Sequence, residues 1–394
     1  MIVGVPRETD ADERRVALVP AIVPSLTKAG LDVLVESGAG EEAGFSNSAY
    51  TEKGARLADS PAAIWREADI VVQVRGAGSR AESRELEIGK LRSGQTVIGF
   101  FDPLSNPDAI AAVSATGAAC FSMELIPRIT RAQSMDALSS MATISGYKSV
   151  LLAANQLPKL FPMLMTAAGT VAPAKVFIVG VGVAGLQAIA TARRLGAVVQ
   201  AYDVRPAVKE QVESVGARFV ELPLETEGAE GQGGYAKAQD ESFYRRQREL
   251  MARVVAESDV VITTAAIPGK KSPVLVTAEM VAGMMPGSVI VDLAAERGGN
   301  CELTKPGEIV VEHGVSIHGP LNLPSSIPFH ASQLYAKNIA TFLLHIAKEG
   351  RISFDSDDAI LRETLLTHNG QLVHPRIREL LGLPSDIQNS PEKA

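Results

Sequence analysis

The sequence predicts an α/β protein with two doubly wound, mostly parallel sheets, in which the C-terminal segment completes the first domain. Three observations support this fold class. Short β-rich runs alternate with helical patterns along the chain, and this alternation implies parallel pairing. The length of 394 residues suits two domains. After a Pro-rich segment at 319–328, too few residues remain for a third domain, so we expect them to return to the first.

The first domain is expected to span residues 1–137 together with 330–384. Apolar runs bounded by turn residues predict strands at 2–5, 32–36, 69–74, 96–100 and 119–123. Helices are predicted near 21–29 and 48–56. The amphipathic pattern at 332–348 predicts a long helix, which would pack on this domain.

The second domain is expected to span residues 138–329. It follows a polar, Met- and Ser-rich segment and begins with an apolar helix that ends before Pro158. Strands are predicted at 175–179, 198–202, 218–221, 259–264, 288–292, 308–311 and 315–318, with helices at 184–195 and 207–214. The polar tail at 385–394 is expected to be disordered.

Composition excludes several classes of protein. Hydrophobic residues make up 46% and charged residues 21%, which is globular rather than disordered. The net charge of −7 argues against a nucleic-acid partner. The two cysteines are far apart, which argues against a disulfide framework and fits a reducing cytosol. The apolar stretch at 176–192 is too short to cross a bilayer, and the start of the chain lacks a signal-peptide core.

The pattern Gly180-Val-Gly182-Val-Ala-Gly185 gives the strongest local signal. It follows a predicted strand and begins a helix, which is the setting of a Rossmann dinucleotide site. There the first glycine allows the tight turn, the second lets the backbone approach a pyrophosphate, and the third allows close helix packing. Asp203 ends the next strand, where an acid binds the adenosine ribose and favours NAD(H) over NADP(H). Arg205 weakens that preference, because a nearby arginine can bind a phosphate; a turn made only for packing is the alternative.

Three further segments are candidates for a site. The segment from Arg128 to Ser139 is densely polar and suits a carboxamide, although Ser134 or Asp136 could simply cap a helix. The Gly-rich stretch 222–241 is long enough for a functional lid, or else is a solvated acidic loop. The turn at 263–269 follows a strand, and strand ends of a doubly wound sheet face the ligand crevice. A plain strand-to-loop turn is the alternative.

The remaining polar residues carry weaker signals. The six histidines show no metal-like spacing with cysteines or carboxylates, so no metal site is predicted. Neither cysteine has the setting of a nucleophile. Arg14 and Arg15 follow an acidic run and could bind an anion, but we expect them at the solvated surface.

Four stretches resemble the NAD(H)-binding component, called domain I, of proton-translocating NAD(P) transhydrogenase, in the form of a separate soluble alpha chain. Their sequences are VPRETDADERRVALVP, PRITRAQSMDALSS, FIVGVGVAGLQAIATARRLGAVVQAYDVR and GGYAKAQDE. The second and fourth are specific to this family, and the third is shared with alanine dehydrogenase. The resemblance covers about residues 1–384.

The resemblance implies a role for each candidate segment. The residues implied to position the nicotinamide, given as catalytic, are Arg128, Gln133, Asp136 and Ser139. The residues implied to bind NAD(H) are Gly180, Gly182, Val183 and Gly185 at the pyrophosphate, Asp203, Val204 and Arg205 at the ribose, Gly234, Tyr235 and Ala236 in a mobile loop, and Thr264, Ala265 and Ala266 along the crevice.

The resemblance also implies the assembly. Two Rossmann-like domains would form a subunit that is a homodimer. The subunit would dock with a transmembrane component and a separate NADP(H)-binding component, on the cytoplasmic face of the inner membrane.

Direct hydride transfer from C4 of NADH to C4 of NADP⁺ needs aligned rings but no general acid or base. Alanine dehydrogenase, the alternative function, must move protons. In that enzyme a lysine follows the strand equivalent to 69–74, and a histidine follows the one equivalent to 96–100. Here the stretches are VVQVRGAG and VIGFFDPLSN, with neither residue. The sequence therefore favours the transhydrogenase subunit over an amino-acid dehydrogenase.

Overall fold

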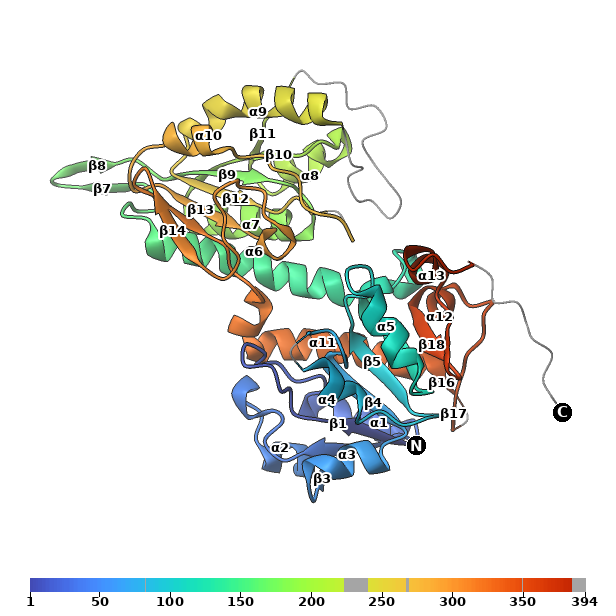
Figure 1. The fold of residues 1–394 in the computed structure, drawn as a ribbon. Helices are drawn as coiled ribbons and strands as arrows, with labels where there is room; N and C mark the ends of the chain where they lie inside the picture. The colour runs from blue at the N-terminus through green and yellow to red at the C-terminus, as the bar shows by residue number, and fades with distance from the viewer. Residues whose placement is uncertain (82, 223–239, 267–268, 349, 385–394) are drawn as a thin grey trace. The chain divides into compact units, whose positions relative to one another are not determined.

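The computed structural model describes residues 1–81, 83–222, 240–266, 269–348 and 350–384. The chain forms two compact units (Figure 1), one of Met1–Met141 with Ser325–Ala394 and one of Ala142–Pro324. We call them unit 1 and unit 2 and describe each by itself. Within the described ranges, no helix combines the length and apolar character that crossing a bilayer requires.

Unit 1 is built on an eight-stranded sheet with the order β19-β18-β6-β5-β4-β1-β2-β3. Its strands are β1 (Ile2–Val5), β2 (Asp32–Glu36), β3 (Arg56–Ala58), β4 (Ile70–Arg75), β5 (Thr96–Phe100), β6 (Ala119–Ser122), β18 (Leu365–His368) and β19 (Gln371–Leu372). The first six pair in parallel. β18 then pairs antiparallel with β6, so the C-terminal segment extends the first sheet.

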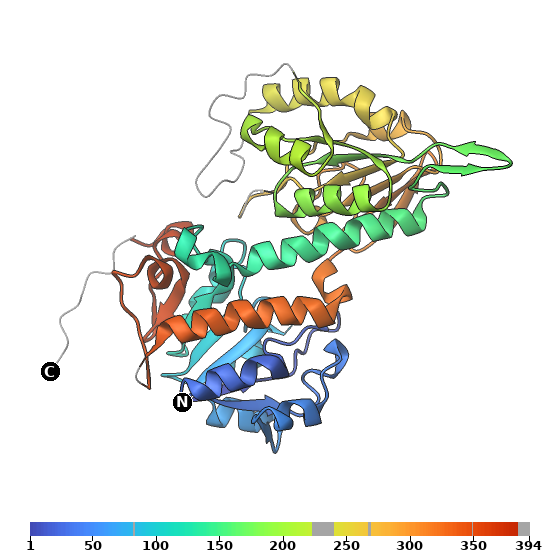
Figure 2. The same cartoon turned by 180° about the vertical axis from the view of Figure 1, so that it is seen from behind.

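Helices cover both faces of this sheet. Their bounds are α1 (Val23–Lys28), α2 (Asn47–Glu52), α3 (Pro61–Glu67), α4 (Arg84–Ile88), α5 (Pro107–Ser114), α11 (Pro328–Ile346), α12 (Ala359–Thr364) and α13 (Pro375–Leu380). Ile64 and Trp65 of α3 share a buried cluster with Ile110 of α5 on one face. The long helix α11 lies along the other face (Figure 2), with Tyr335 stacked near Phe100 at 5.0 Å between ring centroids.

Unit 2 is built on a seven-stranded sheet with the order β11-β10-β9-β12-β13-β15-β14. Its strands are β9 (Lys175–Val179), β10 (Val198–Tyr202), β11 (Arg218–Phe219), β12 (Val260–Thr263), β13 (Val289–Asp292), β14 (Ile309–Glu312) and β15 (Val315–His318). Only β14 runs antiparallel among these described strands. Together the two sheets confirm the predicted doubly wound α/β fold with a discontinuous first domain.

The helices of unit 2 also lie on both faces of the sheet. They are α6 (Ala137–Gln156, which begins before the division between the units), α7 (Val183–Arg194), α8 (Lys209–Ser214), α9 (Glu241–Ala256) and α10 (Ala278–Ala282). α6, α7 and α8 share one buried cluster with the sheet, and α9 and α10 share the other. A separate hairpin of β7 (Leu164–Thr166) and β8 (Gly169–Val171) extends away from the sheet of this unit (Figure 1).

Most predicted strands were found at or near their expected bounds, but the helix predicted near 48–56 was wrong at its end. α2 stops at Glu52 because Gly54 adopts a φ of 93°, a left-handed conformation that a helix cannot continue through. Arg56–Ala58 then forms β3, the edge of the sheet. The helix predicted at 149–157 is also longer than expected, because α6 already begins at Ala137.

Candidate functional site

The glycine-rich turn between β9 and α7 forms a tight strand-to-helix connection in unit 2. Gly180 has a φ of 94°, and its N–H donates to the Tyr202 carbonyl at 2.9 Å. A Cβ on Gly180 would lie 2.8 Å from Thr264 Oγ1. The Thr264 hydroxyl donates to the Gly180 carbonyl at 2.9 Å, which fastens this turn to the end of β12. The first glycine is therefore required both by its φ and by its neighbour.

The other two glycines of the motif differ sharply in their surroundings. A Cβ on Gly185 would lie 2.0 Å from the Gly180 carbonyl oxygen, so this position is closed to any side chain. A Cβ on Gly182 would meet nothing within 4 Å. Gly182 is also the N-cap of α7, and no side chain caps that helix or places an acid in its first turn. The turn thus presents free backbone N–H groups and open space, which suits an anion.

Asp203 follows β10 and lies beside this turn. Its carboxylate is buried and accepts a hydrogen bond from the Val181 N–H at 2.7 Å. Arg205 donates to the same carboxylate from its backbone N–H at 2.9 Å and from Nε and Nη2 at 2.8 Å. Four donors match the roughly four lone-pair positions of a carboxylate. A ribose hydroxyl can therefore bind Asp203 only if Arg205 gives up one of its hydrogen bonds.

The turn after β12 is held from behind by Asn300. Asn300 Oδ1 accepts from the Ala265 N–H, and its Nδ2 donates to the Ala265 carbonyl, both at 2.9 Å. Ala266, the next residue, is exposed. Asp292, fully buried at the end of β13, accepts from the Asn300 N–H at 2.7 Å and from Thr263 Oγ1 at 2.9 Å. Sequence reasoning missed Asn300 and Asp292, although an acid at the end of a predicted strand was a usable signal.

Unit 2 therefore brings several predicted residues to one edge of its sheet. These are Gly180, Gly182, Val183, Gly185, Asp203, Val204, Arg205, Thr264, Ala265 and Ala266. They belong to the β9–α7 turn and to the carboxyl ends of β10 and β12, which flank β9 in the sheet. Gly234, Tyr235 and Ala236 lie outside the described residues.

The polar segment predicted to position the nicotinamide belongs to unit 1. It forms a 3₁₀ turn at Thr130–Met135, followed by Asp136 and the start of α6. Asp136 accepts from the Ser139 N–H at 2.9 Å and from the Ser139 hydroxyl at 2.6 Å, as a helix-capping acid does. Arg128 and Gln133 are exposed. The segment thus has a rigid end at Asp136 and an exposed end at Arg128.

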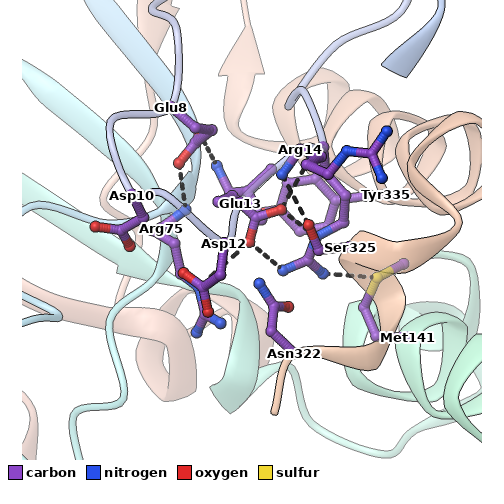
Figure 3. A network of polar contacts seen from close by, with 12 residues as sticks. Glu8, Asp10, Asp12, Glu13, Arg14, Arg75, Met141, Asn322, Ser325 and Tyr335 are labelled. Atoms are coloured by element: carbon purple, nitrogen blue, oxygen red, sulfur yellow. Dashed lines mark hydrogen bonds and ion pairs between the residues drawn. The ribbon is translucent and has the colours of Figure 1, made fainter. Parts of the chain in front are cut away.

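A buried ionic network occupies the N-terminal region of unit 1 (Figure 3). The expectation that Arg14 and Arg15 both lie at the surface was wrong for Arg15, which is only 4% exposed. Its Nε and Nη2 bind the two carboxylate oxygens of Glu13 at 2.7 and 2.6 Å. Arg75 Nε approaches the same carboxylate at 3.4 Å. Burial of Arg15 is favourable here because its charge is paired with Glu13 in bidentate geometry.

Comparisons with known proteins match this geometry. Residues 4–145 match the family model described as alanine dehydrogenase/PNT, N-terminal domain, and residues 149–375 match its C-terminal domain. The chain belongs to the alanine dehydrogenase/PNT family. It is 45% identical to the separately encoded first portion of the NAD(P) transhydrogenase alpha subunit of Rhodospirillum rubrum, over 96% of this chain and 99% of that protein.

Solved structures of the alanine dehydrogenase/PNT family have the same fold. A transhydrogenase from Sinorhizobium meliloti superposes with a TM-score of 0.82 at 45% identity, covering 95% of this chain and 99% of that one. An L-alanine dehydrogenase superposes with a TM-score of 0.80 at 26% identity, covering 97% and 99%. The resemblance to the transhydrogenase alpha subunit, carried by four sequence stretches, is thereby confirmed.

The two domains of the alanine dehydrogenase/PNT family, as defined by sequence, do not coincide with the two compact units. The match to the C-terminal domain extends to residue 375, whereas unit 1 resumes at Ser325. The long helix α11 and strand β18 therefore belong to the second domain by sequence and to the first unit by packing.

Glu8 lies next to the buried ionic network of this family member. Its two carboxylate oxygens accept from the Val74 N–H at 2.7 Å and the Arg75 N–H at 3.1 Å. Burial, and then the charge of Glu13, raise the pKa of Glu8 from 4.5 to about 8. The folded chain thus holds the Glu8 proton more tightly than the unfolded chain does. Stability is greatest below about pH 4.5 in this respect and is lost as the pH rises towards 8.

Replacing Glu8 with glutamine should therefore flatten the pH dependence of stability. Between pH 5 and 8, the free energy of unfolding of wild type should fall relative to that of Glu8→Gln by about 2 kcal/mol, allowing for partial exposure. Urea titrations at each pH measure both values. The slope is compared rather than the absolute stability, because the amide NH₂ of Gln would face a backbone N–H at every pH. Parallel curves for the two proteins would contradict the raised pKa.

Proposed function

We propose that the chain is the NAD(H)-binding subunit of a proton-translocating transhydrogenase. In this proposal, hydride passes from C4 of NADH directly to C4 of NADP⁺ bound on a partner subunit, and a transmembrane partner couples that transfer to proton movement. The chain would sit at the cytoplasmic face of the inner membrane through these partners. The observation that carries the proposal is the open Gly182 turn at an uncapped helix N-terminus, in a chain 45% identical over 96% of its length to a transhydrogenase subunit.

The residues at the edge of the unit 2 sheet fit a dinucleotide. Backbone N–H groups at Gly182 and Val183 would meet the pyrophosphate, where the open side of Gly182 leaves room for it. Asp203 would accept from the adenosine ribose after Arg205 gives way. Thr264, Ala265 and Ala266 would line the crevice, with Ala265 kept in place by Asn300. Gly234, Tyr235 and Ala236 would close over the nucleotide.

The polar segment of unit 1 would align the nicotinamide ring. Gln133 and Arg128 are exposed and carry amide and guanidinium donors for a carboxamide. Asp136 and Ser139 would hold the end of the segment rigid through their two hydrogen bonds. The work of these residues is alignment, because hydride transfer between two nicotinamides needs rings at contact distance rather than proton transfer.

The proposal is tested with the intact chain and its partners. NADH oxidation by the chain alone should be negligible, and addition of the NADP(H)-binding component should give reduction of NADP⁺ or an analogue. Absence of reduction with a nucleotide-loaded partner would overturn the proposed function.

Shortening Gln133 to asparagine should slow the hydride step more than it weakens NADH binding. We expect a fall in single-turnover rate of about tenfold or more, because a misplacement of about 1 Å is costly for a reacting pair. The dissociation constant for NADH should change by less than about threefold. Stopped-flow absorbance and equilibrium titration measure the two quantities. Ser134→Ala, in the same exposed turn, is the matched control and should change neither. A large loss of affinity with an unchanged transfer rate would contradict the positioning role.

The second candidate is an NAD-dependent alanine or amino-acid dehydrogenase, which the TM-score of 0.80 to L-alanine dehydrogenase keeps in view. The charges in unit 1 argue against it. At the end of β4 stands Arg75 rather than a lysine, and it approaches the carboxylate of Glu13. Phe101 and Asp102 follow β5, where the dehydrogenase has a histidine. Reductive amination of pyruvate by the chain alone would favour this second function.

The homodimer implied by the resemblance has a candidate contact surface in the β7–β8 hairpin. Met165 and Leu164 are 77% and 42% exposed on it, an unusual exposure for large apolar side chains. We expect Met165→Asp to shift the sedimentation coefficient from dimer towards monomer at micromolar concentration. Lys175→Asp, an exposed change on strand β9 of the same unit, serves as the control for added negative charge. A monomeric wild type would remove the dimer from the proposal.

A further inference from the structure

Unit 1 contains a cavity of about 460 Å³ that none of the proposed NAD(H) residues lines. Its walls include Pro6, Trp65, Gln73, Glu87 and Lys90. The volume is within the range of small-molecule sites. The strand order places β1 between β2 and β4, so successive connections leave β1 in opposite directions there. Ligands of open α/β sheets bind at such a switch point, outside the carboxyl ends of the strands.

The sequence of strand ends explains how the cavity is formed. Pro6 directly follows the last residue of β1, and Glu36 is the last residue of β2. Gln73 lies near the end of β4, on the same face as Val71, because side chains alternate along a strand. Val71 packs in one buried cluster with Trp65 of α3. The Gln73 side chain thus points to the face that Trp65 covers.

Gln73 supplies a second, independent sign of a ligand. Its residue is only 7% exposed, yet its Oε1 is shut off from solvent and accepts no hydrogen bond from any described residue. A buried acceptor without a donor costs free energy, and such atoms are uncommon in folded proteins. A donor group on a bound molecule would remove that cost.

The charges around the cavity indicate the chemistry of the molecule. Glu87, buried in the wall that also holds Gln73, already accepts from the Gly78 N–H at 3.0 Å and remains a further acceptor at the inner end. Glu36 accepts from the Arg7 N–H at 3.0 Å, and the Arg7 side chain pairs with Glu42 at 3.4 Å. Lys90 is exposed, with its Nζ 5.7 Å from the Trp65 ring centroid, and no carboxylate pairs with it among the residues described. Acceptors therefore lie inside, and an unpaired cation lies at the mouth.

We propose that this cavity binds a small aliphatic zwitterion. Its ammonium group donates to Gln73 Oε1 and to Glu87, its methylene groups lie against Trp65 and the proline rings, and its carboxylate pairs with Lys90. The site is separate from the proposed NAD(H) site, which lies in unit 2 and in the segment from Arg128 to Ser139.

The test uses the full chain and three matched probes: 4-aminobutyrate, butyrate without the ammonium group, and butylamine without the carboxylate. Titration calorimetry measures affinity. Because Trp65 is the single tryptophan of the chain, intrinsic fluorescence reports directly on the cavity. 4-Aminobutyrate should bind saturably and change the Trp65 emission, and the two incomplete probes should bind at least about tenfold more weakly.

Two variants assign the contacts. Gln73→Leu keeps the volume but removes the acceptor, and should weaken 4-aminobutyrate about tenfold. Lys90→Gln, at an exposed position, should weaken 4-aminobutyrate and butyrate but leave butylamine unchanged. Both variants should bind NADH as wild type does, which separates this site from the proposed function. Absence of saturable binding, equal binding of all three probes, or an affinity unchanged in both variants would overturn the proposal.

Discussion

Gly185→Ala is expected to lose nearly all affinity for NADH, because the added methyl group has no space. Its Cβ would lie 2.0 Å from the Gly180 carbonyl oxygen, so the first turn of α7 must move away from β9. That movement displaces the backbone N–H groups proposed to bind the pyrophosphate. We expect the dissociation constant to rise by about a hundredfold or more, with a loss of stability of about 1–3 kcal/mol from overpacking.

Gly182→Ala is the matched comparison, because it adds the same methyl group where nothing lies within 4 Å. Its midpoint of thermal unfolding should stay within about 2 °C of wild type. Its affinity for NADH should nevertheless fall about tenfold or more, since the methyl group enters the space proposed for the pyrophosphate. Fluorescence titration with NADH and thermal unfolding measure both variants. Full NADH affinity in Gly182→Ala would show that the nucleotide does not use this turn.

Asp203→Asn is expected to remove the preference for NADH over NADPH. The change keeps the size of the side chain but removes the charge that pairs with Arg205 and, by proposal, binds the adenosine ribose. NADH should bind about 10–100-fold more weakly, the usual effect of losing a hydrogen bond to a charged group. The Arg205 guanidinium would then be available to a 2′-phosphate, so NADPH should bind more tightly than it does to wild type.

The contribution of Arg205 is isolated by a second pair of variants. Asp203→Asn combined with Arg205→Ala should bind NADH weakly and lose the gain for NADPH. Arg205→Ala alone removes the two side-chain donors, Nε and Nη2, from the Asp203 carboxylate and should not weaken NADH. The backbone N–H of residue 205 remains as a donor, so the carboxylate stays oriented. Competition titrations with both dinucleotides measure the preference, and an unchanged preference in Asp203→Asn would contradict this account.

The sequence was sufficient for the glycine turn because its requirements are local. Gly180 follows a buried strand, and Gly185 lies in the first turn of a regular helix, so spacing alone indicates the geometry. The same holds for Asp203, which is recognisable as an acid at the end of a strand. The bounds of β9 and β10 followed from apolar runs with clear ends.

Burial of charged residues could not be predicted in this way. Glu13 and Arg15 belong to an acidic and basic run that is typical of a solvated surface, yet both are buried in unit 1. Their burial depends on residues distant in sequence, since Arg15 also donates to the Met141 sulfur at 3.0 Å. Asn300 was missed for a similar reason: its role comes from Ala265, which only the folded sheet places beside it. The orphaned Gln73 acceptor is likewise visible only once the cavity exists.

The antiparallel pairing of β18 with β6 determines the order in which the chain can fold during its synthesis. The Thr367 hydroxyl donates to the Ala118 carbonyl across 249 positions of sequence, and Tyr335 reaches the Gln73 carbonyl across 262. The β6 edge and one face of the first sheet therefore remain uncovered until the ribosome has completed most of the chain. Unit 2 is continuous and can fold before that point. The N-terminal half, although made first, is completed last, and its unpaired edge is the place where a nascent chain is most exposed to aggregation and to chaperones.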